Sequence, residues 1–153
     1  MCLLKNPNQF KHYTSTKRGV GTRVFKVMKC ISKPEHDDVF VVSPFRPYVP
    51  YAIKDKMKPA VTITVDNLDA KSVLTAGVIH SYLSLDTCNL VLECDILPYA
   101  EPGERFCIVE CMIPEGTPYW VGMDNVHCAS TELILEKILL TRKKTRAISA
   151  ICW

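Results

Sequence analysis

The feature that most constrains the fold is a long apolar run in the second half of the chain. It extends from Phe106 to Ile113, and nearly every residue in it is apolar, several of them β-branched. A run of this length, bounded by charge on one side and by Pro-Glu-Gly-Thr-Pro on the other, is typical of a strand buried on both faces. The next apolar segment extends from Tyr119 to Val121. The sequence therefore predicts a two-strand hairpin on which the rest of the domain packs.

The length of the chain limits it to one domain, residues 1–153. A chain of this size buries roughly 70% of its unfolded surface, so its core requires neither disulfides nor a metal. The start of the chain lacks the apolar stretch of a signal peptide, and no run reaches the roughly eighteen apolar residues that span a bilayer. We therefore expect a cytoplasmic protein without membrane contact, whose eight cysteines are reduced.

Charge is segregated along the chain. The formal charge is +8 over residues 1–60, −10 over residues 61–136 and +5 over residues 137–153. Acidic and basic segments can face each other within the fold or between subunits, which would suit a homo-oligomer. Alternatively, the basic ends converge on a phosphate-bearing ligand. Residues 1–19 are expected to form a basic arm or loop and residues 141–153 a basic tail, with no sequence-specific nucleic-acid binding.

Local patterns predict an α+β fold. Strands are expected at residues 23–31, 39–42, 60–65 and 78–83, and Ser84 is a suitable N-cap for a short helix from Leu85 to about Cys94. Residues 132–140 fit a buried strand, with a helix as the alternative. We expect a mostly antiparallel sheet, strongly curved or closed into a small barrel, with one or two short helices.

Several short motifs occur in a fixed order along the chain. They include Met1-Cys2-Leu3, Ser43-Pro44-Phe45, His80-Ser81-Tyr82 and Ile113-Pro114-Glu115-Gly116-Thr117-Pro118-Tyr119. In this order they resemble a largely uncharacterised family of small accessory proteins encoded by tailed phages and prophages. The resemblance implies a protein made in the cytoplasm of a bacterial host during phage infection, and it supplies no mechanism.

Two residues are candidates for catalysis. If Met1 is removed, the thiol of Cys2 lies beside a free α-amine with a pKa near 7.7, an arrangement in which a nucleophile carries its own base. His80 lies on a predicted strand that ends in Ser81 and Tyr82 and leads into the capped helix, and it can act as general base to Cys2. The structural alternatives are a cysteine packed against the core and a buried histidine bonded to a backbone carbonyl.

Aromatic and basic residues suggest a ligand site. Within the proline-rich segment, Phe45 and Tyr48 offer faces on which a base can stack, and Arg46 offers a fork for phosphate. Together with His80, the further candidate ligand residues are Lys26, Ser81 and Tyr82. The alternative is a proline-rich loop anchored in the core by Phe45.

The sequence assigns no metal and no cofactor. Cys107 and Cys111 lie in the predicted buried strand, where four residues span about 13 Å, whereas two thiolates on one zinc are at most about 4.6 Å apart. The two cysteines are therefore expected to be core residues. The chain also lacks the glycine-rich loops that bind nucleotide phosphates.

Three classes of function remain open. The first is a small phage-type protein that binds, and in one version hydrolyses, a phosphorylated nucleotide signal and so counters host immunity. The second is a hydrolase or transferase with Cys2 as nucleophile. The third is a protein-binding inhibitor of a host enzyme, whose charged faces contact its partner.

Overall fold

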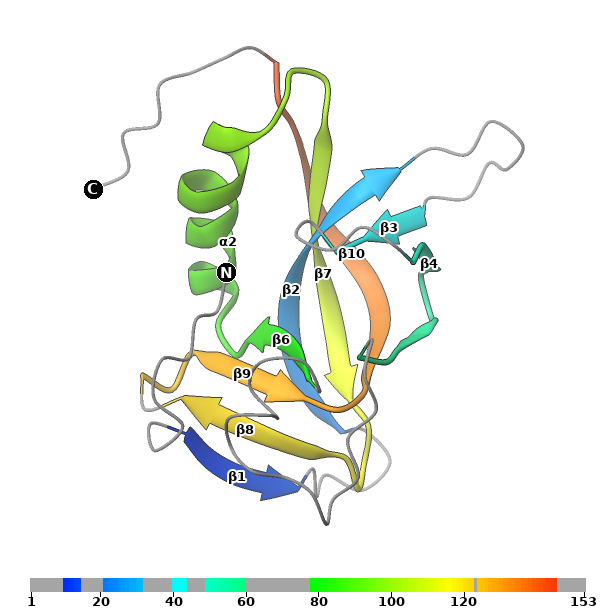
Figure 1. Cartoon of the computed structure of the whole chain (residues 1–153), viewed down its shortest axis with the longest axis vertical. Helices are drawn as coiled ribbons and strands as arrows, with labels where there is room; N and C mark the ends of the chain where they lie inside the picture. Colours follow the sequence, from blue (N-terminus) through cyan, green and yellow to red (C-terminus); the bar gives the residue numbers. More distant parts are fainter. Residues whose placement is uncertain are drawn as a thin grey trace.

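The computed structural model describes residues 10–14, 21–31, 40–43, 49–59, 78–122 and 124–145. In these residues the chain forms one ten-stranded sheet with a short helical unit against one face (Figure 1). All the strand pairs of this sheet are antiparallel. The strands are β1 (Phe10–Thr14), β2 (Thr22–Ile31), β3 (Phe40–Val42), β4 (Tyr51–Ala52), β5 (Lys56–Met57), β6 (Ile79–Tyr82), β7 (Arg105–Ile113), β8 (Pro118–Gly122), β9 (His127–Ser130) and β10 (Leu133–Lys143).

The sheet is centred on its three longest strands. Its order is β1-β8-β9-β6-β2-β7-β10-β5, while β3 and β4 extend from β2. Figure 1 shows β1, β8 and β9 crossing the lower part of the molecule, steeply inclined to β2, β7 and β10. The path ends at β1 on one side and at β5 on the other. The α+β class and the mostly antiparallel sheet are thus confirmed, but the expected strongly curved or barrel-like sheet is not.

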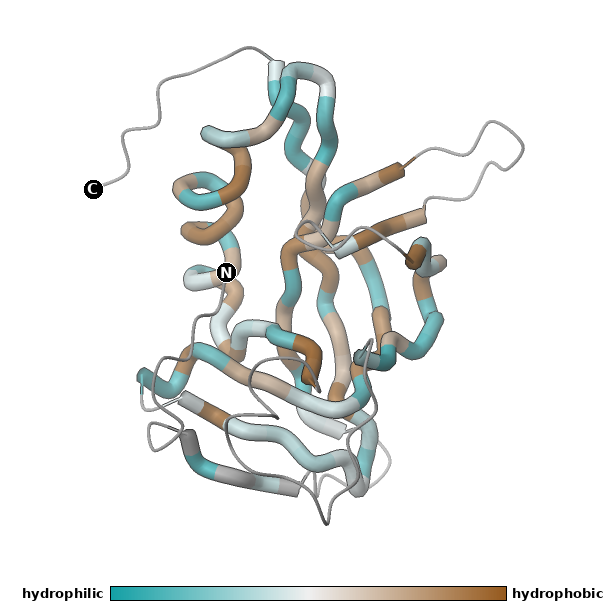
Figure 2. The backbone as a smooth tube through the Cα atoms, viewed as in Figure 1, coloured by the Kyte–Doolittle hydropathy of each residue, from teal (hydrophilic) through white to brown (hydrophobic). Residues whose placement is uncertain are grey.

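Strand β7 is buried on both faces, as its apolar sequence predicted. Its even-numbered residues Phe106 and Ile108 pack in a cluster with the helical unit. Its odd-numbered residues pack in the larger cluster on the opposite face, which contains Cys107, Val109, Cys111 and Ile113. Hydrophobic stretches accordingly occur both on α2 and on the strands beside it (Figure 2).

The predicted hairpin is wrong, although both of its strands exist. After the turn in which Thr117 N–H donates to Pro114 O at 3.1 Å, β8 pairs with β1 and β9 and not with β7. β7 lies between β2 and β10. The local turn sequence marks where the chain reverses, but the pairing is decided by which distant strands have matching apolar faces.

The helical unit begins where the sequence predicted. The Ser84 side chain caps it by accepting the Thr87 N–H at 3.3 Å. The unit comprises α2 (Leu85–Val91), a π-helical turn (Leu92–Ile96) and a 3₁₀ turn (Leu97–Tyr99). Cys88, Leu92 and Ile96 form its buried stripe. This stripe faces β7 and β2, which explains why so short a helix is stable.

Other segments resolve or revise the remaining expectations. Residues 133–143 form strand β10, so the strand alternative is correct for this region, and the strand continues three residues into the expected basic tail. Residues 10–14 form β1 within the expected arm. The arm prediction missed this strand because a short polar edge strand has little apolar periodicity. The predicted strand at residues 60–65 lies outside the described residues.

Candidate functional site

The structure places part of the site predicted from sequence. Cys2, Phe45, Arg46 and Tyr48 lie outside the described residues, so the pairing of Cys2 with His80 and the aromatic-basic loop stay predictions. The four described candidates occur on β2 and β6, which pair through Phe25 and Tyr82.

Lys26 and His80 are brought together by this pairing. The Lys26 ammonium donates to the His80 backbone carbonyl at 2.7 Å, so this contact uses the main chain of His80. Ser81 is fully buried, and its Oγ has no hydrogen-bond partner in the described part of the chain. Tyr82 is also buried, with its ring centroid 5.3 Å from that of His127. Ser81 and Tyr82 are therefore buried side chains of the core.

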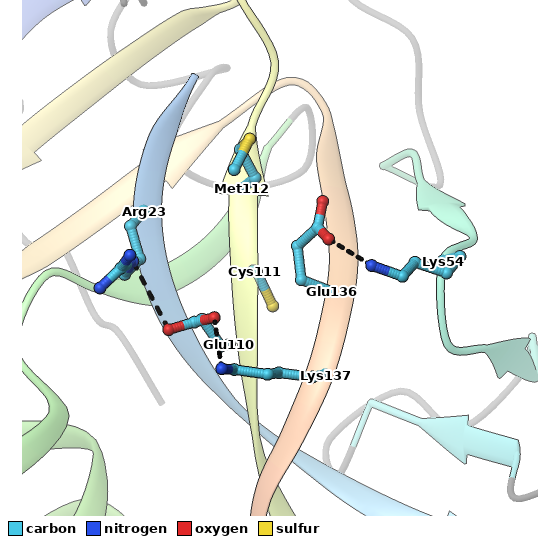
Figure 3. A pocket seen from close by; sticks show the side chains of 7 residues that line it. All are labelled: Arg23, Lys54, Glu110, Cys111, Met112, Glu136 and Lys137. Atoms are coloured by element: carbon cyan, nitrogen blue, oxygen red, sulfur yellow. Dashed lines mark hydrogen bonds and ion pairs between the residues drawn. The ribbon is translucent and has the colours of Figure 1, made fainter. Parts of the chain in front are cut away.

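A separate pocket of about 260 Å³ lies over β2, β7 and β10 (Figure 3). Its lining combines five charged side chains with two sulfur-containing ones. The residues are Arg23, Lys54, Glu110, Cys111, Met112, Glu136 and Lys137.

The pocket exists because β10 bulges at this point. The register with β7 shifts between Leu135 and Lys137, which leaves Glu136 as the extra residue opposite the β7 strand. The turn before β5 fits against the bulge: Lys54 N–H donates to Leu135 O at 2.6 Å, and Leu135 N–H donates to Asp55 O at 3.0 Å. Lys54 has a φ of 80°, which is unusual for a residue other than glycine. Residues with an unfavourable backbone conformation are concentrated at functional positions, so the φ of Lys54 is a further indication of a functional site.

The charges of the pocket are arranged in depth. Glu110 lies between Arg23 at 3.5 Å and Lys137 at 3.7 Å, and Glu136 pairs with Lys54 at 2.7 Å (Figure 3). The side chains of the three cations are 69%, 64% and 71% exposed in that order, whereas those of Glu110 and Glu136 are 16% and 26% exposed. The two carboxylates are therefore more buried than the three cations. The cations form a basic rim, defined here as Arg23, Lys54 and Lys137.

Cys111 lines the pocket but is not expected to act as a nucleophile. Cys111 is fully buried, and burial raises the pKa of its thiol far above the ordinary value. A neutral thiol is a poor nucleophile. The described residues also contain no group of three or more His, Cys, Asp or Glu side chains that could hold a metal ion. The arrangement is suited to binding charged groups.

Sequence reasoning missed this pocket, although two signals were present. Glu110 is a lone charge inside a strand that is otherwise buried, and Glu136 and Lys137 interrupt the apolar pattern of β10. The bulge and the conformation of Lys54 have no local sequence signature. Without them, the sequence does not indicate that these side chains meet.

A second cluster occupies the β8–β9 turn. The side chain of Asp124 contacts His127 Nδ1 and accepts the backbone N–H groups of Val126 at 3.0 Å and His127 at 3.1 Å. Burial opposes ionisation of Asp124, but these hydrogen bonds outweigh it, so the pKa of Asp124 is below its ordinary value. The sequence analysis did not predict this Asp–His contact. The cluster explains the tight turn.

Two neighbouring thiols are expected to differ in reactivity. The Cys107 thiol hydrogen-bonds to Cys30, and this bond, helped by Arg105, lowers the pKa of Cys30 against the opposing effect of burial. The same hydrogen bond and burial raise the pKa of Cys107. Since the thiolate is the reactive form, we expect iodoacetamide to label Cys30 at least about tenfold faster than Cys107 or Cys111 in the native protein. Peptide mapping by mass spectrometry measures these rates.

The control for this prediction is the same labelling in urea, where all three cysteines are expected to react at similar rates. Equal labelling of Cys30 and Cys107 in the native protein would contradict it.

Comparisons with known proteins add nothing to the geometry. Among the described residues, no helix combines the length and apolar character needed to cross a membrane. No protein-family model, curated protein or solved structure matches the chain.

Proposed function

We propose that the protein is a binding protein that holds an acidic segment of a partner protein at the basic rim. The observation that carries this proposal is that the cations of the pocket are more exposed than its carboxylates. Arg23, Lys54 and Lys137 are 64% to 71% exposed, and the carboxylates that pair with them are no more than 26% exposed. An approaching surface therefore meets positive charge first, and complementary charge favours an acidic partner.

The size of the pocket supports a protein partner over a nucleotide. Small-molecule sites usually enclose about 300–1,000 Å³ and bury most of the ligand, whereas this pocket measures about 260 Å³. That volume suits one or two side chains. The cations of the ion pairs around the pocket can also exchange their carboxylate for one of the partner, because an exposed ion pair contributes only about 0–1 kcal/mol. A rim cation can thus take a partner carboxylate at little cost.

Binding of a partner protein agrees with the third class of function expected from the sequence, a protein-binding inhibitor of a host enzyme. If the resemblance to phage proteins holds, the acidic segment belongs to a host enzyme that the protein inhibits. Binding of a phosphorylated nucleotide stays a prediction; the contact between Lys26 and His80 is compatible with it, but that ammonium is held by a carbonyl at 2.7 Å. The Cys2 chemistry and the homo-oligomer also stay predictions.

Charge reversal at the rim tests the proposal. The partner is first recovered from a lysate of the bacterial host, and its affinity is then measured by isothermal titration. We expect Lys137→Glu to weaken binding at least about tenfold, because it replaces attraction by repulsion at the rim, and a tenfold change corresponds to about 1.4 kcal/mol.

The matched control is Lys11→Glu, an exposed lysine on β1 that carries the same charge change outside the pocket. It is expected to bind like the unmodified protein. Recovery of no partner, or equal affinity of the Lys137→Glu protein, would contradict the proposal.

A further inference from the structure

Within the part of the chain that the structure describes, the outer edge of strand β10 is largely unpaired. On one side it pairs with β7 from Ile134 to Lys143. On the other side β5 pairs only with Leu133 and Ile134, and the turn before β5 adds hydrogen bonds to Leu135. From Glu136 onward, no strand of the described residues covers this edge. Unpaired N–H and C=O groups on such an edge are a template for another strand.

Two irregularities limit where another strand can pair. The register with β7 shifts between Leu135 and Lys137 and again between Ile138 and Leu140. Bulges of this kind disrupt an edge and discourage pairing. After the second bulge the register is regular over residues 140–143, where Thr141, Arg142 and Lys143 are exposed. The accessible edge is therefore this four-residue segment.

The positive charge of this segment determines which kind of strand can pair with it. A second copy pairing antiparallel through residues 140–143 would bring two Arg142 and two Lys143 side chains together, and like charges across strands are destabilising. Arg142 pairs with Glu93 at 3.2 Å, but both side chains are substantially exposed, 50% and 42%, so the pair is weak and exchangeable. An acidic strand meets both cations favourably.

We propose that an extended acidic segment of the partner adds as a strand to residues 140–143 of β10 and continues toward the basic rim. Lys137 belongs to the rim and lies on the same strand, three residues before Leu140. In this mode, main-chain hydrogen bonds supply affinity and alternate side chains supply specificity. The inference rests on the proposed function and specifies how the partner binds.

Amide hydrogen exchange followed by NMR tests this mode. The probe is the peptide acetyl-Glu-Glu-Val-Glu-Val-Glu-Glu-amide, and the control is the same peptide with lysine in place of each glutamate. We expect the acidic peptide to slow exchange of outward-facing amides within residues 140–143 at least about tenfold, since a bound strand protects them. The lysine peptide is expected to leave them unchanged.

Variants separate edge pairing from general charge attraction. Arg142→Glu is expected to abolish the slowing, whereas Lys11→Glu, on β1, is expected to retain it. Equal slowing by both peptides, or slowing that survives Arg142→Glu, would overturn the inference.

The experiments distinguish absence of strand pairing at residues 140–143 from absence of binding at the basic rim. If the acidic peptide shifts the signals of Lys54 and Lys137 but leaves residues 140–143 unprotected, edge pairing is overturned and binding at the rim stands. If the peptide does not bind at all, edge pairing is again overturned. The titrations with the recovered partner then decide the proposed function independently.

Discussion

Replacing Gly21 by alanine is expected to lower the free energy of unfolding by roughly 2–5 kcal/mol, from left-handed strain and overpacking together. Gly21 has a φ of +71°, and a Cβ there would lie 2.2 Å from the Ile113 carbonyl oxygen and 2.8 Å from Met112 Cγ. The oxygen belongs to the backbone of β7, which is fixed between two strands and cannot move aside. The loss should appear in urea unfolding followed by circular dichroism.

Gly116→Ala is the matched control for this prediction. Gly116 has a φ of +82°, but nothing lies within 4 Å of a Cβ built there. Its substitution should therefore cost only the left-handed strain, about 1–2 kcal/mol. The difference between the two variants measures the clash with Ile113. If both variants lost the same stability, the close approach of β2 to β7 would not matter.

The close approach at Gly21 also matters for the pocket. Gly21 immediately precedes β2, whose first pair is Thr22 with Ile113, and Arg23 of the rim follows with Met112 as its partner. A shift of this end of β2 moves Arg23 relative to Glu110. We therefore infer that the glycine fixes one side of the pocket as well as the strand.

Local signals in the sequence predict strand β7 and the start of the helix. The apolar run at residues 106–113 forms β7, because a strand between two packed layers needs apolar residues on both faces. Ser84 caps the helix because its hydroxyl can accept an N–H group that has no partner within the helix. These outcomes depend on neighbouring residues alone.

Pairing between distant segments is not predictable in the same way. β8 was expected beside β7, but it lies between β1 and β9. A turn sequence fixes the reversal of the chain, whereas partner choice depends on the apolar faces of strands far apart in sequence.

The pocket likewise depends on contacts between distant segments that the local sequence does not predict. Lys54 meets Glu136 at 2.7 Å across 82 positions of sequence, and a bulge in β10 makes room for this contact. Lys26 and His80, both chosen from sequence, do lie together, but through a backbone carbonyl. Residue types suggest candidates; only the strand register decides which of them share a site.

Replacing Lys144 by methionine is expected to lower the free energy of unfolding by about 2 kcal/mol, because two hydrogen bonds from a charged donor are lost. Lys144 is only 4% exposed, and its ammonium donates to Leu97 O at 2.7 Å and to Pro98 O at 3.3 Å. These carbonyls belong to the 3₁₀ turn that ends the helical unit, where a cation is favoured by the helix dipole. Methionine keeps much of the apolar stem but no donor, so the partly buried carbonyls of Leu97 and Pro98 lose the ammonium, at about 1–3 kcal/mol. Leu97 O then keeps the N–H of Ala100, at 3.2 Å.

Lys143→Met is the control for Lys144→Met, because Lys143 is the exposed neighbour at the end of β10 and surface changes usually stay within about 0.5 kcal/mol. Urea unfolding compares the two variants, and equal stability would show that the Lys144 ammonium contributes nothing. The backbone of Lys144 also bonds to Gly103 and Glu104 at 2.6 and 2.8 Å. Lys144 thus joins the end of β10 to the turn before β7 and to the end of the helical unit. We therefore expect hydrogen exchange in residues 92–99 to accelerate in Lys144→Met and to remain unchanged in Lys143→Met.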